Sequence, residues 1–496
     1  MEYLKYSIED STIAELLGVQ NFSNDEAAVL ELIKNAYDAN ALVVTLEFID
    51  KTTLKITDNG DGMDSEDIKR HWMHVGKSNK GYDFIDTNNN VRVQAGAKGV
   101  GRFALSRLGK NIQLYSKKAQ KDRVVWETDW NKSILDSDSS IENKGTCIVI
   151  NNLREKWTPK RIKKLNEYLE KTYNDTAMKI RIIANEYDEF VKSHFPKPEP
   201  GKNCRANIVL EYNKGILSVS VFSDEFSSDA IKYCPEIDLN MHNSEVNIFD
   251  EFEGSEISEM EGEELFSKLD ELGGFSGNLL FNLNATKQDK EKFLYKYLST
   301  DEGVDSGVIL YRNAFSISSF EGEKDWLGLG KRSRKSPAAA SHPTGAWRVR
   351  ENQVSGYVSI DKQENRVLQD LMNRQGLDEN IYYQLFVQII LTGIKEFERY
   401  RQNIIRKINK KNKNEERFIK KISDEIIKNP KIIESLDKND KDKLINELRL
   451  FKRDNKELKQ EKANVEARYK YDVRILNALA TSGMKATSIA HEIYND

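Results

Sequence analysis

The sequence has only three cysteines among its 496 residues, and Cys147, Cys204 and Cys234 lie far apart without C-x-x-C spacing. This scarcity argues against a disulfide framework and against a zinc site, and it suits a reducing cytosol. No apolar run approaches the ~20 residues that a membrane-spanning helix needs. The first ten residues, MEYLKYSIED, lack the basic-then-apolar order of a signal peptide. We therefore predict a cytoplasmic protein without membrane contact.

Positive charge is not in excess either. Lys and Arg number 76 against 80 Asp and Glu, which gives a formal net charge of -4. This balance does not point to nucleic acid as a partner. Charged residues make up 31% and aromatic residues 9% of the chain, a mixture that suits a protein with a true core and excludes wholesale disorder. Since 496 residues exceed what one core usually supports, we expect two or three structural units.

The first predicted domain covers residues 1–195, where apolar helical patterns alternate with short β-branched runs such as residues 43–48 and 54–57. We expect an α+β fold here, with helices layered on a mixed sheet. Residues 76–101 are rich in Asn, Gly and Asp and carry few periodic apolar residues. This stretch reads as a long loop, and loops of that length inside a compact domain are usually functional.

Two further regions follow. Strand-like runs return in residues 196–385, at 206–212, 307–311 and 356–360, and they predict a second α/β domain. Residues 386–496 are rich in Lys and Glu, nearly free of Gly and broken once by Asn429-Pro430, so they read as two long helices. A solvated helical hairpin and a dimerising coiled coil are both compatible with this pattern.

The first motif with chemical content is a helix-compatible segment, Glu31-Leu-Ile-Lys-Asn35-Ala-Tyr-Asp38. Spacings of four and three residues place Glu31, Asn35 and Asp38 on one helix face. Two carboxylates and a carboxamide are groups that can polarise a water molecule and hold a metal ion. Taken alone, such a face is also common on solvent-exposed helices.

The second motif, Asp58-Asn-Gly60-Asp-Gly62-Met63, follows directly after a predicted strand. A carboxylate at the end of a strand can accept a hydrogen bond from an exocyclic amine. Gly60 and Gly62 allow the backbone to turn tightly and to approach a flat ligand without a Cβ clash. A plain Asp-Gly turn is the alternative interpretation of this hexapeptide.

The third motif is a glycine cluster, Gly96-Ala-Lys98-Gly99-Val-Gly101-Arg-Phe, which runs into a helical pattern. Glycines at a helix start expose backbone N–H groups at the positive end of the helix dipole, where a phosphate can bind. Many glycines merely cap helices, so the cluster alone is weak evidence. It is not a Walker A loop, because the G-x-x-x-x-G-K-[ST] arrangement is missing.

The order and spacing of the three motifs resemble the GHKL ATPases, the superfamily of gyrase B, MutL, the ninety-kilodalton heat-shock chaperones, MORC proteins and histidine kinases. The resemblance covers about residues 20–150. It implies a Bergerat-type α/β sandwich that binds ATP with Mg²⁺. It further implies that residues 196–385 form a transducer-like domain, and that the protein acts as a homodimer on a partner or client that the sequence does not identify.

The resemblance assigns roles at the phosphate end of the expected site. Glu31 matches the family's general base, Asn35 its magnesium ligand and Asp38 a residue that supports them. The amides of Gly99 and Gly101 would meet the β- and γ-phosphates. The remaining residues expected near the lid and phosphates are Lys77, Ser78, Lys98, Val100, Arg102 and Phe103.

At the adenine end, Asp58 matches the aspartate that reads the adenine amino group, and Gly60 and Gly62 match the turn beneath the base. Met63 would pack on the base, and the Thr146 hydroxyl would join the same network. A glutamate at position 31 can take a proton from an attacking water, whereas histidine kinases must keep water away from ATP. Hydrolysis is therefore the favoured activity for this domain.

The family's second domain sends a basic residue to the γ-phosphate, and the resemblance places Lys331 or Arg332 in that role, within a loop at residues 326–335. A solvated basic loop, or a loop that touches nucleic-acid phosphates, is the alternative, although no base-reading motif accompanies it. Together with the segments Gly307–Phe315 and Asn373-Arg-Gln-Gly-Leu377, this loop resembles a bacterial group of GHKL ATP-binding proteins that are similar to chaperone and MORC ATPases.

The last residues, Thr487-Ser-Ile-Ala-His491-Glu-Ile493, resemble the H-box of histidine kinases. His491 would then be a phosphoacceptor for a kinase-like domain beyond the chain, which makes a signalling protein the second functional hypothesis. A structural histidine near a helix end is the alternative. An ATP-gated DNA clamp in repair or defence is the third hypothesis, since the resemblance to MutL and MORC permits it.

Overall fold

The structure is a computed structural model that describes residues 9–22, 24–75, 83–85, 91–96, 99–139, 143–185, 187–252, 262–300, 307–336, 339–340, 347–371, 376–433 and 441–449. The chain divides into two compact units, Met1–Ile408 and Asn409–Asp496. No helix of the described residues is both long and apolar enough to cross a membrane.

An eight-stranded mixed sheet forms the first layer of the larger unit, in the order β10-β9-β1-β2-β8-β5-β6-β7. Strand β1 pairs with β2 in antiparallel and with β9 in parallel orientation. The strands are β1 (Val43–Phe48), β2 (Leu54–Asp58), β5 (Gly109–Lys117), β6 (Arg123–Thr128), β7 (Ser133–Asp138), β8 (Gly145–Leu153), β9 (Lys179–Ala184) and β10 (Tyr187–Phe190). A short hairpin of β3 (Asp83–Ile85) and β4 (Val91–Val93) stands apart from this sheet.

Three helices cover this sheet and share its core: α2 (Asp25–Asp38), α4 (Ala104–Leu108) and α5 (Pro159–Thr172). Helix α2 begins where the Asn24 side chain accepts a hydrogen bond from the Ala27 N–H at 2.7 Å, a typical N-cap. Its apolar positions Val29, Ile33 and Ala36 recur at helical spacing and are buried. Because that face is fixed on the sheet, the opposite polar side of α2 is held in place.

The remaining short helices near the chain start and the first sheet are α1 (Asp10–Ala14), η1 (Glu15–Val19), α3 (Ser65–Asp67), η2 (Ile68–Trp72) and η3 (Gly101–Phe103). Segment η3 continues directly into α4, so the glycine cluster enters a helix as the sequence predicted.

A second, seven-stranded mixed sheet has the order β13-β12-β11-β14-β17-β15-β16. Its strands are β11 (Ala206–Asn213), β12 (Ile216–Ser223), β13 (Met241–Asn247), β14 (Phe275–Phe281), β15 (Gly307–Arg312), β16 (Phe315–Glu321) and β17 (Val354–Ile360). Its helical segments are η4 (Ser228–Tyr233), α6 (Ile248–Phe252), α7 (Gly262–Glu271), α8 (Lys287–Phe293), α9 (Leu329–Lys335) and η5 (Glu351–Gln353). The predicted fold class, two mixed α/β layers and a long C-terminal helix, is confirmed.

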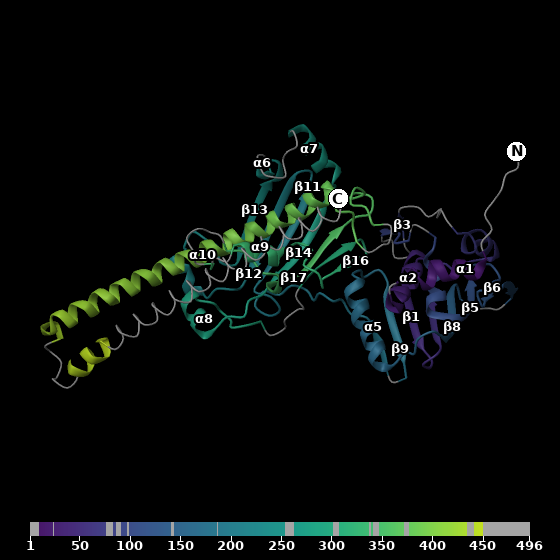
Figure 1. Cartoon of the computed structure of the whole chain (residues 1–496), viewed down its shortest axis with the longest axis horizontal. Coiled ribbons are helices and arrows are strands. Elements are labelled where there is room, and N and C mark those ends of the chain that lie inside the picture. Colours follow the sequence, from purple (N-terminus) through teal and green to yellow (C-terminus); the bar gives the residue numbers. More distant parts are fainter. Residues whose placement is uncertain are drawn as a thin grey trace, which may run out of the picture. The chain divides into compact units, whose positions relative to one another are not determined.

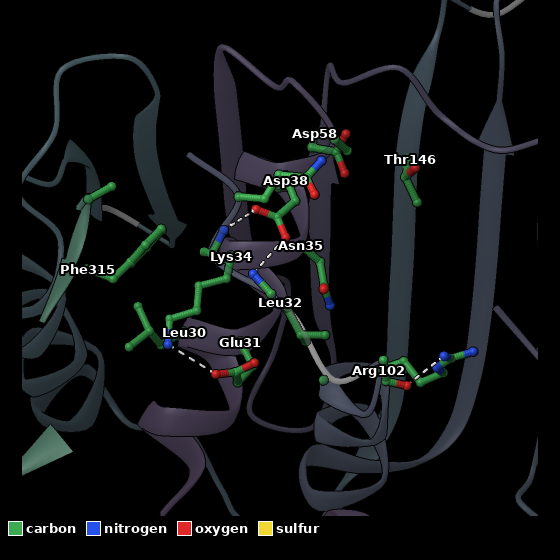
Figure 2. A pocket seen from close by; sticks show the side chains of 18 of the residues that line it. Leu30, Glu31, Leu32, Lys34, Asn35, Asp38, Asp58, Arg102, Thr146 and Phe315 are labelled. Atoms are coloured by element: carbon green, nitrogen blue, oxygen red, sulfur yellow. Dashed lines mark hydrogen bonds and ion pairs between the residues drawn. The ribbon is translucent and has the colours of Figure 1, made fainter. Parts of the chain in front are cut away.

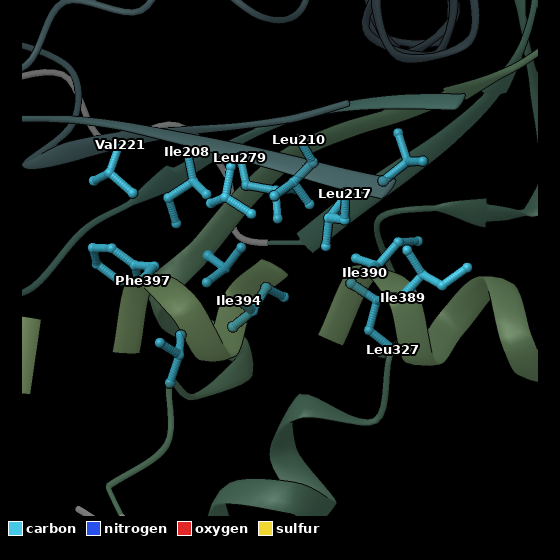
Figure 3. Close-up of a cluster of buried hydrophobic side chains, with 14 of the residues drawn as sticks. Ile208, Leu210, Leu217, Val221, Leu279, Leu327, Ile389, Ile390, Ile394 and Phe397 are labelled. Atoms are coloured by element: carbon cyan, nitrogen blue, oxygen red, sulfur yellow. The ribbon is translucent and has the colours of Figure 1, made fainter. Parts of the chain in front are cut away.

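The long helix α10 (Ile381–Lys428) packs its first part on the second sheet. Figure 3 shows Ile390, Ile394 and Phe397 facing Leu210 and Leu279 of the sheet, and all five side chains are buried. Polar groups are buried in the same interface, because Glu398 and Arg401 of α10 are almost fully withdrawn from solvent. Both charges are paired: Glu398 with Arg332 of α9, and Arg401 with Glu225, which follows β12.

The hairpin between β15 and β16 joins the two sheets. Ala314 and Phe315 belong to the core of the first sheet, although Phe315 begins a strand of the second. The Tyr311 hydroxyl donates to the Lys171 carbonyl at 2.7 Å, and the Asn174 N–H donates to the Ala314 carbonyl at 2.9 Å. The second sheet is therefore attached to the first beside α2 and α5.

The basic segment at residues 326–335 was expected to be a loop, but Leu329–Lys335 forms helix α9, so that prediction was wrong for the part that carries Lys331 and Arg332. Helix α10 ends directly before Asn429-Pro430, as expected, and η6 (Pro430–Ile433) and a helical stretch at 441–449 follow. Most of the second predicted long helix and His491 lie outside the described residues, and the predicted domain boundaries stay predictions.

Candidate functional site

A cavity of about 1220 Å³ lies against α2, the end of β2, the glycine segment (Gly96 and residues 99–103) and the β15–β16 hairpin. Ten of the residues singled out in the sequence line it: Glu31, Asn35, Asp38, Asp58, Gly62, Met63, Gly99, Gly101, Arg102 and Thr146. Gly60, Val100, Phe103, Lys331 and Arg332 do not line it, and Lys77, Ser78 and Lys98 lie outside the described residues. Three separate motifs thus meet at one cavity (Figure 2).

At this cavity, the backbone of the glycine segment lies close to two polar side chains of α2. A Cβ on Gly101 would lie 3.1 Å from Oε2 of Glu31 and 3.7 Å from both polar atoms of the Asn35 side chain. Glycine at this position therefore lets the backbone approach the carboxylate and the carboxamide. An anion held by amides of this segment would face Glu31 and Asn35 directly.

Asp38 contacts the chain just ahead of the glycine cluster. Its two carboxylate oxygens accept hydrogen bonds from the Ala95 N–H at 2.7 Å and the Gly96 N–H at 2.9 Å. Its role in the structure is to position this backbone, since both oxygens are directed to amides.

Arg92, which the sequence did not single out, anchors β4, the strand that precedes this segment. Its buried guanidinium donates to the carbonyls of Ala41 and Ala177, both at 2.7 Å. The two carbonyls lie 136 residues apart in the chain, so no local pattern could have indicated this role.

At the other end of the cavity, Asp58 closes β2 opposite Thr146 on β8. Withdrawal from water raises the pKa of the Asp58 carboxyl to about 6, against hydrogen bonds from the Gly60 and Thr146 backbone N–H groups that favour the charged form. The Gly60 bond measures 2.8 Å. A carboxylate in this position is a strong acceptor for a ligand amine near neutral pH.

Ser116 links the residues around Asp58, and the sequence did not identify it. Its hydroxyl lies 2.9 Å from the Thr146 hydroxyl and accepts the Met63 N–H at 2.8 Å. Because Ser116 is buried on β5, this network fixes the Thr146 hydroxyl and the turn that carries Met63 at the cavity wall.

Gly60 and Gly62 lie where neighbouring backbone leaves no room for a side chain. A Cβ on Gly60 would lie 2.5 Å from the Ala39 carbonyl oxygen, and one on Gly62 would lie 2.1 Å from the Lys117 carbonyl oxygen. Gly62 also has φ of +68°, a conformation that favours glycine. The tight turn that the sequence predicted therefore needs glycine at both positions, while the approach of a flat ligand to them stays a prediction.

Arg102 was expected to contact the ligand, but its guanidinium is bound by backbone. It donates to the carbonyls of His71 and His74 at 2.8 Å and of Gly99 at 2.7 Å. Burial lowers the pKa of Arg102 to about 10, so the group stays charged at neutral pH. Arg102 lines the cavity while tying the glycine segment to the end of η2.

The two predicted sensor residues lie away from the cavity. Lys331 is exposed on α9, and Arg332 donates two bonds, at 2.6 and 2.7 Å, to the fully buried carboxylate of Glu398. A different lysine of the second sheet region reaches the cavity. Lys362 follows β17, lines the cavity, and donates from Nζ to the Gln94 carbonyl at 2.8 Å.

Comparison with known proteins finds a family for the part of the chain that carries the three motifs. Residues 22–156 match the family described as histidine kinase-, DNA gyrase B-, and HSP90-like ATPase. The chaperone protein HtpG of Campylobacter jejuni is 29% identical over 170 residues, which cover 30% of this chain and 28% of that protein. HtpG of Rickettsia canadensis is 30% identical over 181 residues, or 31% and 29% of the two chains.

The DNA mismatch repair protein MutL of Crocosphaera subtropica is 27% identical over 131 residues, 26% of this chain and 23% of MutL. The matched part thus spans less than a third of each of these relatives. The family match at residues 22–156 covers the three motifs, α2, α4 and strands β1 to β8. Residues 22–156 therefore form an ATPase domain of the GHKL family.

Proposed function

We propose that this protein is an ATP-dependent conformational switch that binds ATP with Mg²⁺ and hydrolyses it to ADP and phosphate. The observation that carries this proposal is the approach of Gly101 to Glu31 and Asn35 in a cavity whose other end holds Asp58. A nucleotide needs an acceptor for its base at one end and amides, a metal ligand and a proton acceptor at the other. These groups come from segments far apart in the sequence.

The adenine end fits a purine amine. The Asp58 carboxylate would accept the adenine amino N–H, while the Thr146 hydroxyl, held by Ser116, would bond to a ring nitrogen. Met63 and Ile148 line the cavity nearby and offer apolar surface to the base. Selection of adenine would then rest on a charged acceptor, which discriminates more strongly than shape alone.

The residues near the phosphate end suit a Mg²⁺ ion that is bound mainly by the substrate phosphates. Among the described residues no group of three or more His, Cys, Asp or Glu side chains could hold a metal ion by itself. Asn35 offers one carboxamide oxygen beside the glycine segment. Mg²⁺ usually keeps several waters and binds substrate phosphates with few protein ligands, so one such oxygen is sufficient. When bound, the ion would neutralise phosphate charge.

Hydrolysis requires a group that accepts a proton from water. Glu31 lies on the cavity wall with Oε2 toward Gly101, where the γ-phosphate would bind. Water would form a bond to the γ-phosphorus, the bond from that phosphorus to the bridging oxygen would break, and Glu31 would take the proton. ADP and phosphate would leave.

Lys362 is the basic residue that we assign to the γ-phosphate in place of Lys331 or Arg332. Lys362→Met should lower ATP turnover about ten-fold or more, since removal of one preorganised donor to transition-state charge costs at least that much. Lys331→Met is the matched control, because Lys331 is exposed and does not line the cavity. Steady-state phosphate release checks both variants. Equal loss in both, or loss with Lys331→Met alone, would overturn the assignment.

The raised pKa of Asp58 predicts a pH-dependent affinity for the adenine moiety. Binding needs the ionised carboxylate, so protonation below pH 6 removes the acceptor, and the affinity for adenosine should fall about ten-fold between pH 7 and pH 5. Adenosine is the probe because the terminal phosphate of a nucleotide itself titrates at about pH 6. Calorimetry checks the result. Asp58→Asn should bind weakly at every pH, and a wild-type affinity that is constant over this range would contradict the assignment.

The switch is proposed to act as a homodimer. Closure of two protomers on ATP would connect the cavity to the second sheet and α10, and hydrolysis would reset it. Light scattering of the Glu31→Gln variant with and without ATP tests this, and a monomer under both conditions would contradict it. His491 lies outside the described residues, so the signalling alternative stays a prediction, as do the DNA clamp and the identity of a client.

A further inference from the structure

Glu31 is not alone on the cavity wall, because Lys34 is bonded to it. The Lys34 ammonium donates to Oε1 of Glu31 at 3.1 Å, from one turn further along α2. The two side chains are only 20% and 16% exposed. An ion pair with this little solvent is stronger and better fixed in geometry than a typical surface pair.

The two oxygens of Glu31 face different neighbours. Oε1 accepts the bond from Lys34, whereas Oε2 is the atom that lies 3.1 Å from the position of a Cβ on Gly101. Because a carboxylate is planar and rigid, holding one oxygen sets the direction of the other. Lys34 therefore directs Oε2 toward the glycine segment.

Lys34 has a second neighbour that belongs to the second sheet. Its Nζ lies 5.5 Å from the centre of the Phe315 ring, at a distance typical of a cation–π contact. Figure 2 shows the Lys34 ammonium bonded to Glu31 on the side of the cavity where Phe315 lies. The Phe315 ring is itself fixed edge-on against Tyr37 at 5.4 Å.

The surroundings favour this position of the ammonium. Glu321, also on β16, is partly buried, and the charges of Lys34 and Lys171 counteract the rise in its pKa that desolvation causes. The charge of Lys34 therefore also acts on an acid of the second sheet.

We infer that Lys34 is a positioning residue that aims Glu31 at the γ-phosphate site and is itself held by Phe315 of the second sheet. The chain of contacts from Phe315 through Lys34 to Glu31 is the route by which the position of the second sheet affects hydrolysis. This inference rests on the proposed role of Glu31 as general base.

The test separates an effect on the position of Glu31, measured by kcat, from an effect on ATP binding. Lys34→Met should lower kcat about ten-fold or more, because a misplaced base costs rate steeply, while ATP affinity measured by calorimetry stays within about three-fold, since the lysine is assigned no contact with the nucleotide. Lys34→Arg, which keeps the charge and can still bond to Oε1, should restore most of kcat. Lys55→Met is the matched control, because Lys55 pairs with Glu47 at 3.2 Å on the exposed part of β1 and β2.

A further pair of variants tests the contact between Lys34 and Phe315. Phe315→Leu should also lower kcat, and adding it to Lys34→Met should lower kcat no further, because both changes break one chain of contacts. Thermal melting identifies variants that merely unfold, since Phe315 is buried. Additive losses in the double variant would overturn the route from the second sheet.

Failure of the inference and failure of the proposed function are distinguishable. If Glu31→Gln abolishes hydrolysis while Lys34→Met keeps the wild-type kcat, the role of Lys34 is overturned and the base assignment stands. If Lys34→Arg is as slow as Lys34→Met despite a native melting temperature, the positioning role is overturned as well. Undiminished hydrolysis by Glu31→Gln would overturn both the proposed role of Glu31 as general base and the role of Lys34.

Discussion

Replacing Glu31 with Gln is expected to slow ATP hydrolysis by about 10²- to 10⁴-fold, the usual contribution of a general base. The carboxamide has the same shape as the carboxylate but cannot take a proton from water. Affinity for ATP should change by less than about three-fold, because the assigned binding groups are Asn35, Asp58 and the glycine amides. Phosphate release and calorimetry on the same preparation check the two parts.

Glu47→Gln is the control for this experiment. Glu47 lies on β1 of the same sheet, is 37% exposed in its side chain and pairs with Lys55 away from the cavity. It should hydrolyse ATP at the wild-type rate. Phosphate release by Glu31→Gln at the rate of this control would show that another group takes the proton.

Replacing Arg332 with Ala is expected to lower the free energy of unfolding by about 3 kcal/mol, the scale measured when one partner of a buried ion pair is removed. Glu398 is fully buried, and without Arg332 its charge would keep the Val349 N–H at 2.8 Å and the Arg348 guanidinium at 3.7 Å. Since Glu398 belongs to α10, the loss should appear as weaker attachment of that helix to the second sheet. Denaturant unfolding of the full chain measures it.

Arg334 provides a matched comparison on the same helix. It lies two residues from Arg332 on α9, its side chain is 72% exposed, and it pairs with Glu351 at 3.4 Å. Arg334→Ala should cost less than about 1 kcal/mol, as exposed pairs do. Equal stability of the two variants would contradict the structural role of Arg332. A large drop in turnover by Arg332→Ala, at native stability and with Lys362→Met unaffected, would return the sensor role to Arg332.

The sequence allowed the fold class and ten residues of the cavity wall to be predicted, because these depend on local pattern. Glu31 and Asn35 share a face by helical spacing alone, and the strand that ends at Asp58 is fixed by its own alternation of buried Leu54 and Ile56. The glycine cluster enters a helix, as its composition indicated. What these motifs bind could be inferred only from their combined order.

Roles that depend on contacts far along the chain could not be predicted. Arg102 looks like a phosphate ligand in sequence, but its guanidinium is satisfied by the carbonyls of His71 and His74. Arg332 looks like a free basic residue until Glu398, 66 positions later, pairs with it. Lys362 follows an ordinary strand, and only the attachment of the second sheet brings it to Gln94, 268 positions earlier.

The most direct test of the central claim is a structure of the protein with Mg²⁺ and a non-hydrolysable ATP analogue. The adenine amino group should lie within hydrogen-bonding distance of the Asp58 carboxylate, the Asn35 carboxamide oxygen should bind Mg²⁺, and Oε2 of Glu31 should face the γ-phosphate beside Gly101. An analogue bound outside this cavity, or bound within it with Glu31 turned away from the terminal phosphate, would contradict it.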